Sequence, residues 1–169
     1  MEILEATVAD AEEILALQKS AYLFEAKLYN DNTIPPLTQT VEELAEDFSR
    51  KTILKVVEEG RIIGSVNGFL KEGRCFIGRL MVHPGFQRQG IGTRLMAAIE
   101  ARFADAHSCE LFTGELSLRN IRLYEQLGYR TMRKEQPAGK GFSILFMEKN
   151  LKKALDTDAV QDCFCPLKV

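Results

Sequence analysis

The most constraining feature of this chain is a strand that runs into a glycine turn and then a helix, Leu80-Met-Val-His-Pro-Gly-Phe-Gln-Arg-Gln-Gly-Ile-Gly-Thr-Arg-Leu95. The first amides of a helix have no intrahelical acceptor and carry a partial positive charge. Gly90 and Gly92 have no side chains to hold a ligand off this backbone. The segment therefore predicts a cradle for a phosphate or pyrophosphate. Three consecutive polar residues add donors to it: Gln87, Arg88 and Gln89.

Two common phosphate-binding motifs do not fit this segment. A P-loop needs Lys-Ser/Thr after its second glycine, whereas Thr93-Arg94 follows Gly92. A dinucleotide-binding fingerprint needs a third glycine where Leu95 stands, and it needs a preceding parallel β-α-β unit. A plainer alternative stays open, in which the two glycines only permit a sharp corner between strand and helix.

The order of the other elements predicts a mixed α/β (α+β) domain. Turn residues separate three β-rich runs, which indicates an antiparallel meander over residues 52–57, 62–70 and 75–82. Strand and helix then alternate, so helices should pack on the faces of a mixed sheet. Further strands are expected over 2–6, 110–113, 129–134 and 142–148, and helices over 7–29, 40–50, 91–106 and 118–127.

Local signals refine these elements. Helix starts are marked by cap residues at Thr7, Thr40 and Ser117. The segment 30–36 is expected to be a loop, because Pro35 and Pro36 are poor helix residues. Gly64 and Gly68, inside one strand, indicate a bulge or a close approach of another backbone.

Composition limits the classes of function. The chain has 169 residues, 46% of them hydrophobic, and a net charge of −2. We therefore expect one globular domain over residues 1–155, with a loosely ordered tail over 156–169. The charge argues against a nucleic-acid binder, and no apolar run is long enough to cross a membrane. The first ten residues do not resemble a signal peptide, so a cytoplasmic location is expected.

The cysteines and histidines do not indicate a metal site. Cys163 and Cys165 form a single Cys-x-Cys pair near the end of the chain, and the two histidines are isolated. Zinc sites need three or four ligands. Cys75 and Cys109 fall at strand positions typical of core residues. No metal is therefore expected.

Two motifs together resemble a known family. Gln87-x-x-Gly90-x-Gly92, preceded by Leu80-x-Val82-x-Pro84, looks like motif A of the GNAT N-acetyltransferase superfamily. Asn120-x-x-Leu123-Tyr124-Glu125-x-x-Gly128-Tyr129 looks like its motif B. The order of elements also matches that fold from residue 1 to about 149. The resemblance implies a mostly antiparallel twisted sheet of six to seven strands with about four helices, splayed between the strands ending at Val82 and Thr113.

The resemblance also implies a co-substrate, acetyl-CoA or another acyl-CoA. Its pyrophosphate would lie on the backbone from Gln87 to Thr93, which includes Ile91. Its pantetheine arm would pair with the strand edge at Leu80, Met81 and Val82. An amide of Met81 or Val82 would face the thioester carbonyl as an oxyanion donor. Asn120 would hydrogen-bond the arm, and Tyr124 would protonate the departing thiolate.

The residues themselves support the pairing of Asn120 with Tyr124. Positions 120 and 124 lie one turn apart on one side of the expected helix, so both side chains can face one ligand. A phenol with a pKa near 10 can donate a proton as charge develops on a thiolate. The alternative is that Tyr124 is an ordinary half-buried aromatic residue.

The general base and the acceptor stay open. Many relatives carry a glutamate in the strand before motif A, but Cys75–Val82 contains no carboxylate. Glu25, Glu72 and Glu115 are candidate bases, as is a chain of water molecules. Arg79 would pair with an acid in the acceptor channel or face solvent. Candidate acceptor-binding residues are Tyr22, Glu25 and Tyr29.

Aromatic and acidic side chains together suit a cationic amine. A polyamine, an amino sugar, an amino acid or a peptide N-terminus would each fit as acceptor. The function expected is direct transfer of an acetyl group to a primary amine in a ternary complex. The alternative is a non-catalytic module that binds or senses acyl-CoA. Pairing of two copies through edge strands is also possible.

Overall fold

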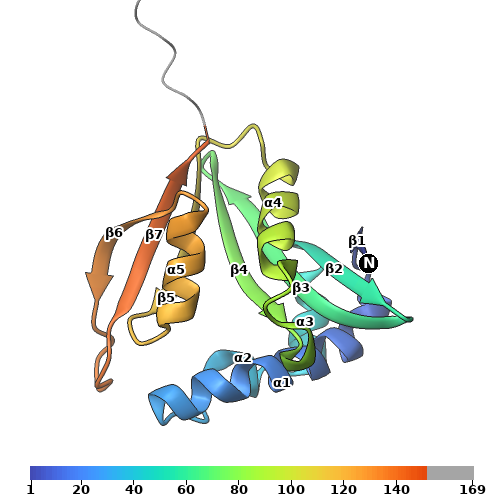
Figure 1. Ribbon diagram of the computed structural model, residues 1–169, viewed down its shortest axis with the longest axis horizontal. Coiled ribbons are helices and arrows are strands. Elements are labelled where there is room, and N and C mark those ends of the chain that lie inside the picture. Colours follow the sequence, from blue (N-terminus) through green and yellow to red (C-terminus); the bar gives the residue numbers. More distant parts are fainter. Residues whose placement is uncertain (152–169) are drawn as a thin grey trace, which may run out of the picture.

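The computed structural model describes residues 1–151, and the expected tail at 156–169 lies outside them. It shows one mixed sheet in the order β1-β2-β3-β4-β5-β7-β6 (Figure 1). All neighbouring strands are antiparallel except β4 and β5. The strands are β1 (Glu2–Glu5), β2 (Thr52–Glu58), β3 (Arg61–Lys71), β4 (Arg74–Val82), β5 (Ser108–Gly114), β6 (Arg130–Glu135) and β7 (Ile144–Asn150).

Five α-helices accompany the sheet, one more than the sequence indicated. They are α1 (Ala11–Tyr29), α2 (Pro35–Thr38), α3 (Val41–Asp47), α4 (Ile91–Arg102) and α5 (Leu118–Gln126). Two short 3₁₀ turns, Val8–Asp10 and Pro84–Phe86, precede α1 and α4. The seven strands, the meander β2–β3–β4 and the mixed sheet are confirmed.

The extra helix is α2, where a loop was expected. Pro35 and Pro36 occupy its first two positions, where the missing N–H groups would have had no intrahelical acceptor in any case. Gln18 on α1 then fixes the turn, because its side-chain amide donates to the carbonyl of Pro36 at 3.0 Å. The prediction of a loop was wrong because it applied the rule for helix interiors to a helix start.

Other element ends differ by a few residues. Helix α4 ends at Arg102 rather than near residue 106, and β5 begins at Ser108. The capping box of Thr40 is confirmed, with the backbone N–H of Glu43 donating to the Thr40 hydroxyl at 3.2 Å. Ser117 stands at the N-cap position of α5, but its side chain makes no capping bond.

The sheet splits open between β4 and β5. The two strands pair only from Arg74 to Phe76 on β4 and then diverge, as Figure 1 shows. A bulge in β4 lies just beyond the paired part, where Arg79 takes a φ of +51°. A bulge bends its strand and increases the local twist, so it carries the end of β4 away from β5. The expected splay is confirmed.

Helix α4 packs closely on the meander at the two glycines of β3. A Cβ on Gly64 would lie 3.1 Å from Ile91, and one on Gly68 would lie 3.0 Å from Phe103. Glycine therefore permits the close approach expected from the sequence. Contact at this distance places the first turn of α4 directly beside the end of β4.

Two apolar clusters cover the two faces of the sheet. The larger packs α4 and α5 on one face and includes Leu95, Ile99 and Leu111. The smaller packs α1 and α3 on the other face and includes Ile14, Leu44 and Met81. Helix α1 packs on the β1–β4 side of that face, and its C-terminal end reaches across the gap between β4 and β5 (Figure 1). No helix within residues 1–151 is long and apolar enough to cross a membrane.

Candidate active site

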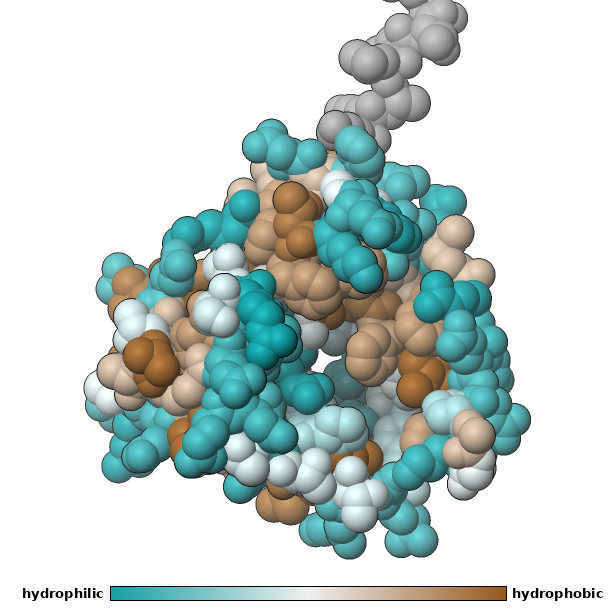
Figure 2. All heavy atoms as spheres, turned by 180° about the vertical axis from the view of Figure 1, so that it is seen from behind, coloured by the Kyte–Doolittle hydropathy of each residue, from teal (hydrophilic) through white to brown (hydrophobic). Residues whose placement is uncertain are grey.

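A cavity of about 1750 Å³ fills the gap between the diverging strands. Figure 2 shows it as a deep hollow in the face opposite α4 and α5, with apolar side chains above and to the right of it and polar ones to the left and below. Its walls come from α1, α2, β4, β5, α5 and the start of α4. All the cofactor-binding candidates except Gln89 line this cavity: Leu80, Met81, Val82, Gln87, Arg88, Gly90, Ile91, Gly92, Thr93 and Asn120.

The turn before α4 presents bare backbone to the mouth of the cavity. Gly90 has a φ of +75° and Arg88 a φ of +65°, so the chain reverses sharply just before the helix. Within residues 1–151, no amide from Gln87 to Thr93 donates a hydrogen bond. A Cβ on Gly90 would meet nothing within 4 Å. These groups form the concave donor site that an anion requires.

The side chain of Gln87 makes two hydrogen bonds at the mouth of the cavity. Its amide nitrogen donates to the carbonyl of Val82 at 3.2 Å, and its oxygen accepts from Arg119 at 2.7 Å. Gln87 thus ties the end of β4 to α5 across the cavity mouth. Its backbone amide and the second N–H of its side chain make no hydrogen bond within residues 1–151. Arg119 was missed because α5 is remote from residue 87 in sequence.

Asn120 and Tyr124 face the cavity from one side of α5, as their spacing predicted. Tyr124 is only 8% exposed, and its ring packs edge-on against Tyr129. Burial, with the nearby Tyr22 and Glu25, raises the pKa of Tyr124 above its usual value of 10. The phenol therefore keeps its proton at neutral pH and is a donor rather than a base.

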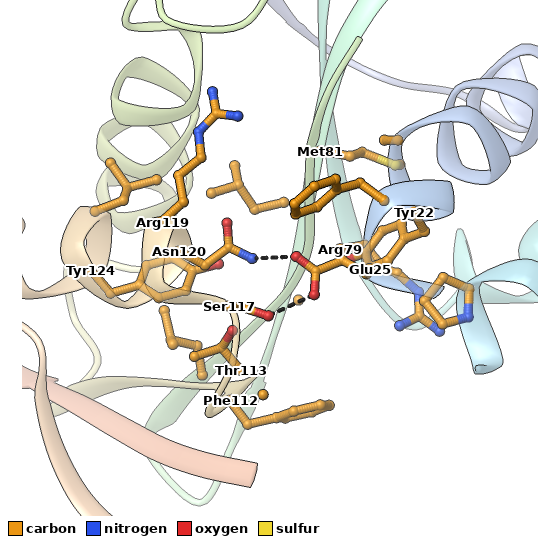
Figure 3. A pocket seen from close by; sticks show the side chains of 18 of the residues that line it. Tyr22, Glu25, Arg79, Met81, Phe112, Thr113, Ser117, Arg119, Asn120 and Tyr124 are labelled. Atoms are coloured by element: carbon orange, nitrogen blue, oxygen red, sulfur yellow. Dashed lines mark hydrogen bonds between the residues drawn. The ribbon is translucent and has the colours of Figure 1, made fainter. Parts of the chain in front are cut away.

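Glu25 crosses the cavity from α1 to α5. Its carboxylate accepts from the Ser117 hydroxyl at 2.6 Å and from the Asn120 amide at 3.2 Å (Figure 3). Strand β4 has no carboxylate where many relatives carry a glutamate. In this structure α1 places a carboxylate, Glu25, in the cavity beside the candidate cofactor residue Asn120. Of the three candidate bases, Glu25 is the one that lines the cavity.

The other two candidates are engaged elsewhere. Glu72 lies in the β3–β4 turn and pairs with Arg74 at 3.7 Å. Glu115 pairs with Lys134 and accepts from the backbone of Ser143 at 2.7 Å. Lys134 and Ser143 lower the pKa of Glu115. The lowered pKa makes Glu115 a weaker base, and neither Glu72 nor Glu115 lines the cavity, so neither position supports that role.

Tyr29 joins the end of α1 to the far wall. Its hydroxyl lies 2.8 Å from the Ser117 hydroxyl and accepts from the backbone of Leu116 at 3.0 Å. The ring fits only because residue 114 is glycine, since a Cβ there would lie 2.0 Å from the Tyr29 hydroxyl. The third acceptor candidate, Tyr22, lies with Arg79 on the opposite wall in Figure 3.

The two described cysteines belong to the core and not to the cavity. Cys75 and Cys109 face each other across the paired part of β4 and β5, with neither side chain exposed. A hydrogen bond to Cys109 and burial raise the pKa of the Cys75 thiol. Within residues 1–151, no three His, Cys, Asp or Glu side chains gather as metal ligands would. Cys163 and Cys165 lie outside the described residues.

A sheet splayed at one parallel pair, with an unpaired helix start at the mouth of the gap, is the arrangement that the resemblance to GNAT acetyltransferases implied. The family model described as Acetyltransferase (GNAT) family matches residues 12–129. This match covers most of the chain, which therefore belongs to the GNAT acetyltransferase family.

Individual proteins are also similar to this chain. The chain is 28% identical to the UPF0157 protein YqkA of Bacillus subtilis over 95% of its length, although it spans only 46% of that protein. It is 24% identical to the L-amino acid N-acyltransferase MnaT of Escherichia coli, covering 95% of this chain and 99% of MnaT. The fold matches the PaiA N-acetyltransferase of Thermoplasma acidophilum, solved with coenzyme A, with a TM-score of 0.76 at 17% identity, covering 88% and 98% of the two chains.

Proposed function

We propose that this protein transfers an acetyl group from acetyl-CoA to a primary amine, directly and in a ternary complex. One observation carries the proposal. A single cavity joins the bare amides before α4 to Tyr124 and Glu25, so a donor and an acid–base pair share one space. Acetyl-CoA supplies a thioester, whose carbonyl carbon is open to attack by a neutral amine.

The residues of the cradle fit the diphosphate of coenzyme A. The amides from Gln87 to Thr93 offer donors to its oxygens, and Gly90 and Gly92 allow contact with the backbone. The edge of β4 beyond Phe76 is not paired with β5, so Leu80, Met81 and Val82 can pair with an extended arm. An amide there would stabilise negative charge on the thioester oxygen.

The chemistry needs one proton removed and one supplied. As the amine nitrogen bonds to the carbonyl carbon, it loses a proton to Glu25, directly or through water. The carbon–sulfur bond breaks, and Tyr124 donates its proton to the departing thiolate. The raised pKa keeps the Tyr124 phenol protonated at neutral pH, so the proton is present when the thiolate leaves. No covalent acyl-enzyme is required, because Cys75 and Cys109 are buried in the core.

The proposal is tested with two measurements on the full chain. Calorimetry with acetyl-CoA should show binding that ATP does not compete away, since the site is shaped for the arm as well as the diphosphate. Release of free coenzyme A should then depend on an added amine. Tight binding of acetyl-CoA without release for any amine would instead support the non-catalytic acyl-CoA-binding module.

A further inference from the structure

Arg79 is a cationic side chain in the cavity that the transfer chemistry does not use. It lies half-buried on β4, where its backbone has a φ of +51°. Burial raises the pKa of the Tyr22 hydroxyl, and the nearby guanidinium of Arg79 offsets part of this rise through its charge and a hydrogen bond. Such a φ is unfavourable for a non-glycine residue, so a strained backbone holds this cation at the cavity wall.

The charge of Arg79 has no acidic partner within residues 1–151. The neighbouring cation on the same wall, Lys51, is paired with Asp47 at 2.8 Å. Glu25, across the cavity, is held by Ser117 and Asn120 and forms no ion pair with Arg79. Two other carboxylates line the cavity, but Asp31 pairs with Lys140 and Glu110 with Arg74. Glu25 and Arg79 face the same space from its two sides, and neither is in an ion pair within the described part of the chain (Figure 3).

Aromatic side chains also line the cavity. Two phenylalanines lie on β3 and β4 and two on β5 and β7, and we call the four of them the aromatic wall: Phe69, Phe76, Phe112 and Phe146. Phe69 and Phe76 stack with centroids 5.4 Å apart, and Phe112 and Phe146 lie 5.9 Å apart. Phe112 is 61% exposed, so an apolar group bound against it would gain buried area.

From these three features we infer that the acceptor is a free α-amino acid with a large apolar or aromatic side chain. The inference rests on the proposed transfer to an amine. The amino group lies at Glu25 beside the thioester, the carboxylate pairs with Arg79, and the side chain packs on the aromatic wall. Guanidinium and carboxylate form paired, charge-assisted hydrogen bonds, so Arg79 selects acceptors that carry a carboxylate next to the amine.

The charge pattern separates this class from the other amines that would fit. A polyamine or amino sugar would bring further positive charge toward Arg79 in a half-buried site, where like charges repel strongly. A peptide N-terminus has an uncharged amide in place of the carboxylate and would leave the guanidinium without a partner. A zwitterionic amino acid alone satisfies both Glu25 and Arg79.

The test compares three acceptors that share one side chain: L-phenylalanine, its amide and 2-phenylethylamine, each with acetyl-CoA and the full chain. For the wild type, kcat/KM for L-phenylalanine should exceed that for either analogue by about 10- to 100-fold, the size of a charged hydrogen-bonded contact. An amide lowers the pKa of its amine, which favours attack, so the preference for L-phenylalanine over its amide cannot come from amine protonation.

Two substitutions assign the preference to its residue. Arg79→Asn removes the charge with a residue that tolerates a positive φ, and should lower kcat/KM for L-phenylalanine to the level of its amide without changing the amide. Arg79→Lys should keep part of the preference. Arg102→Asn, on the exposed end of α4, is the matched control and should change nothing.

A third substitution tests the aromatic wall. Phe112→Ala should raise KM for L-phenylalanine about tenfold, because less apolar area is buried, and should leave KM for L-alanine nearly unchanged. Met132→Ala, equally exposed on β6 but outside the cavity, is its control.

The outcomes distinguish the two proposals. Equal rates for the acid, the amide and phenylethylamine would overturn the amino-acid acceptor while the transferase stands. An equal loss with all three acceptors in Arg79→Asn would do the same. Acylation of none of them, nor of spermidine, would overturn the proposed transferase and this inference with it.

Discussion

The two ends of the cavity are built in different ways. At the α4 end, the binding groups are backbone amides from seven consecutive residues, Gln87–Thr93. At the α1 end, they are side chains from segments far apart in the sequence. The Glu25 and Ser117 side chains meet across 92 positions, and Tyr29 and Ser117 across 88. One end is set by local geometry, and the other depends on the whole fold.

This difference bears on what each end can recognise. Backbone amides at a helix start suit any diphosphate, whatever the other side chains are. A side-chain site changes its specificity when one residue changes. The cofactor end is therefore expected to tolerate little variation at its glycines, whereas the acceptor end should respond to single substitutions with changes in selectivity.

The largest effect is expected at the cradle. Gly92→Glu places a side chain and a negative charge among the amides, so affinity for acetyl-CoA should fall more than a hundredfold, to below detection by calorimetry. The matched control is Gly92→Ala. A Cβ there would lie 3.6 Å from Leu123, an ordinary contact, so this variant should fold and bind. Retained affinity in Gly92→Glu would remove the cradle from cofactor binding.

The next effect separates binding from chemistry. Tyr124→Phe keeps the ring that packs on Tyr129 but removes the proton donor. Turnover should fall by roughly ten- to a thousandfold, while the dissociation constant for acetyl-CoA should stay within about twofold. Rapid-quench or steady-state measurement of coenzyme A release gives the rate, and a wild-type rate would exclude the tyrosine as the acid.

The same contrast between local and long-range contacts explains which features of the structure could be predicted from the sequence. The glycine turn and the shared face of Asn120 and Tyr124 were predictable, since each depends on residues within a turn or two of one another. The splay was expected only from the resemblance to the GNAT family, because it joins strands far apart in the sequence. The prediction that Ser117 caps α5 was wrong, because its hydroxyl instead contacts Glu25 and Tyr29 across the cavity.

Side-chain partners across the cavity were not predictable. Nothing near Glu25 in the sequence marks it as the carboxylate beside Asn120, rather than Glu72 or Glu115. The engagement of Gln87 by Arg119 was missed for the same reason. The bulge at Arg79 was also beyond prediction, since no glycine stands at that position to mark the positive φ.

A pH profile tests the acid–base pair at the acceptor end. Activity of the wild type should rise from pH 6 to pH 9, because the fraction of neutral amine increases. Since the pKa of Tyr124 is raised above 10, the phenol keeps its proton throughout, and no falling limb is expected in this range. A flat profile would argue against attack by a free amine.

Glu25→Gln tests the proposed base directly. The variant keeps an oxygen that can accept from Ser117 but loses the basic carboxylate. We expect kcat/KM to fall about 10- to 100-fold, the lower part of the range for a general base. Affinity for acetyl-CoA should fall less than activity, since Glu25 contacts Asn120 but accepts from no amide of the cradle. A loss of cofactor affinity equal to the loss of activity would show that the two ends are not independent.

The smallest effect is expected from a change that touches no reacting group. Gly114→Ala would place a Cβ 2.0 Å from the present position of the Tyr29 hydroxyl, so the ring must move. Its bonds to Ser117 and Leu116 would be lost, and Ser117 would hold Glu25 less firmly. KM for the acceptor should rise about three- to tenfold, with kcat and acetyl-CoA affinity little changed, as initial-rate kinetics would show.

Tyr29→Phe is the matched variant, because it removes the same hydroxyl without the clash. If the two variants agree, the effect belongs to the hydrogen bonds across the cavity; if only Gly114→Ala is impaired, it belongs to the displaced backbone, and the acceptor end depends less on those bonds than its geometry indicates.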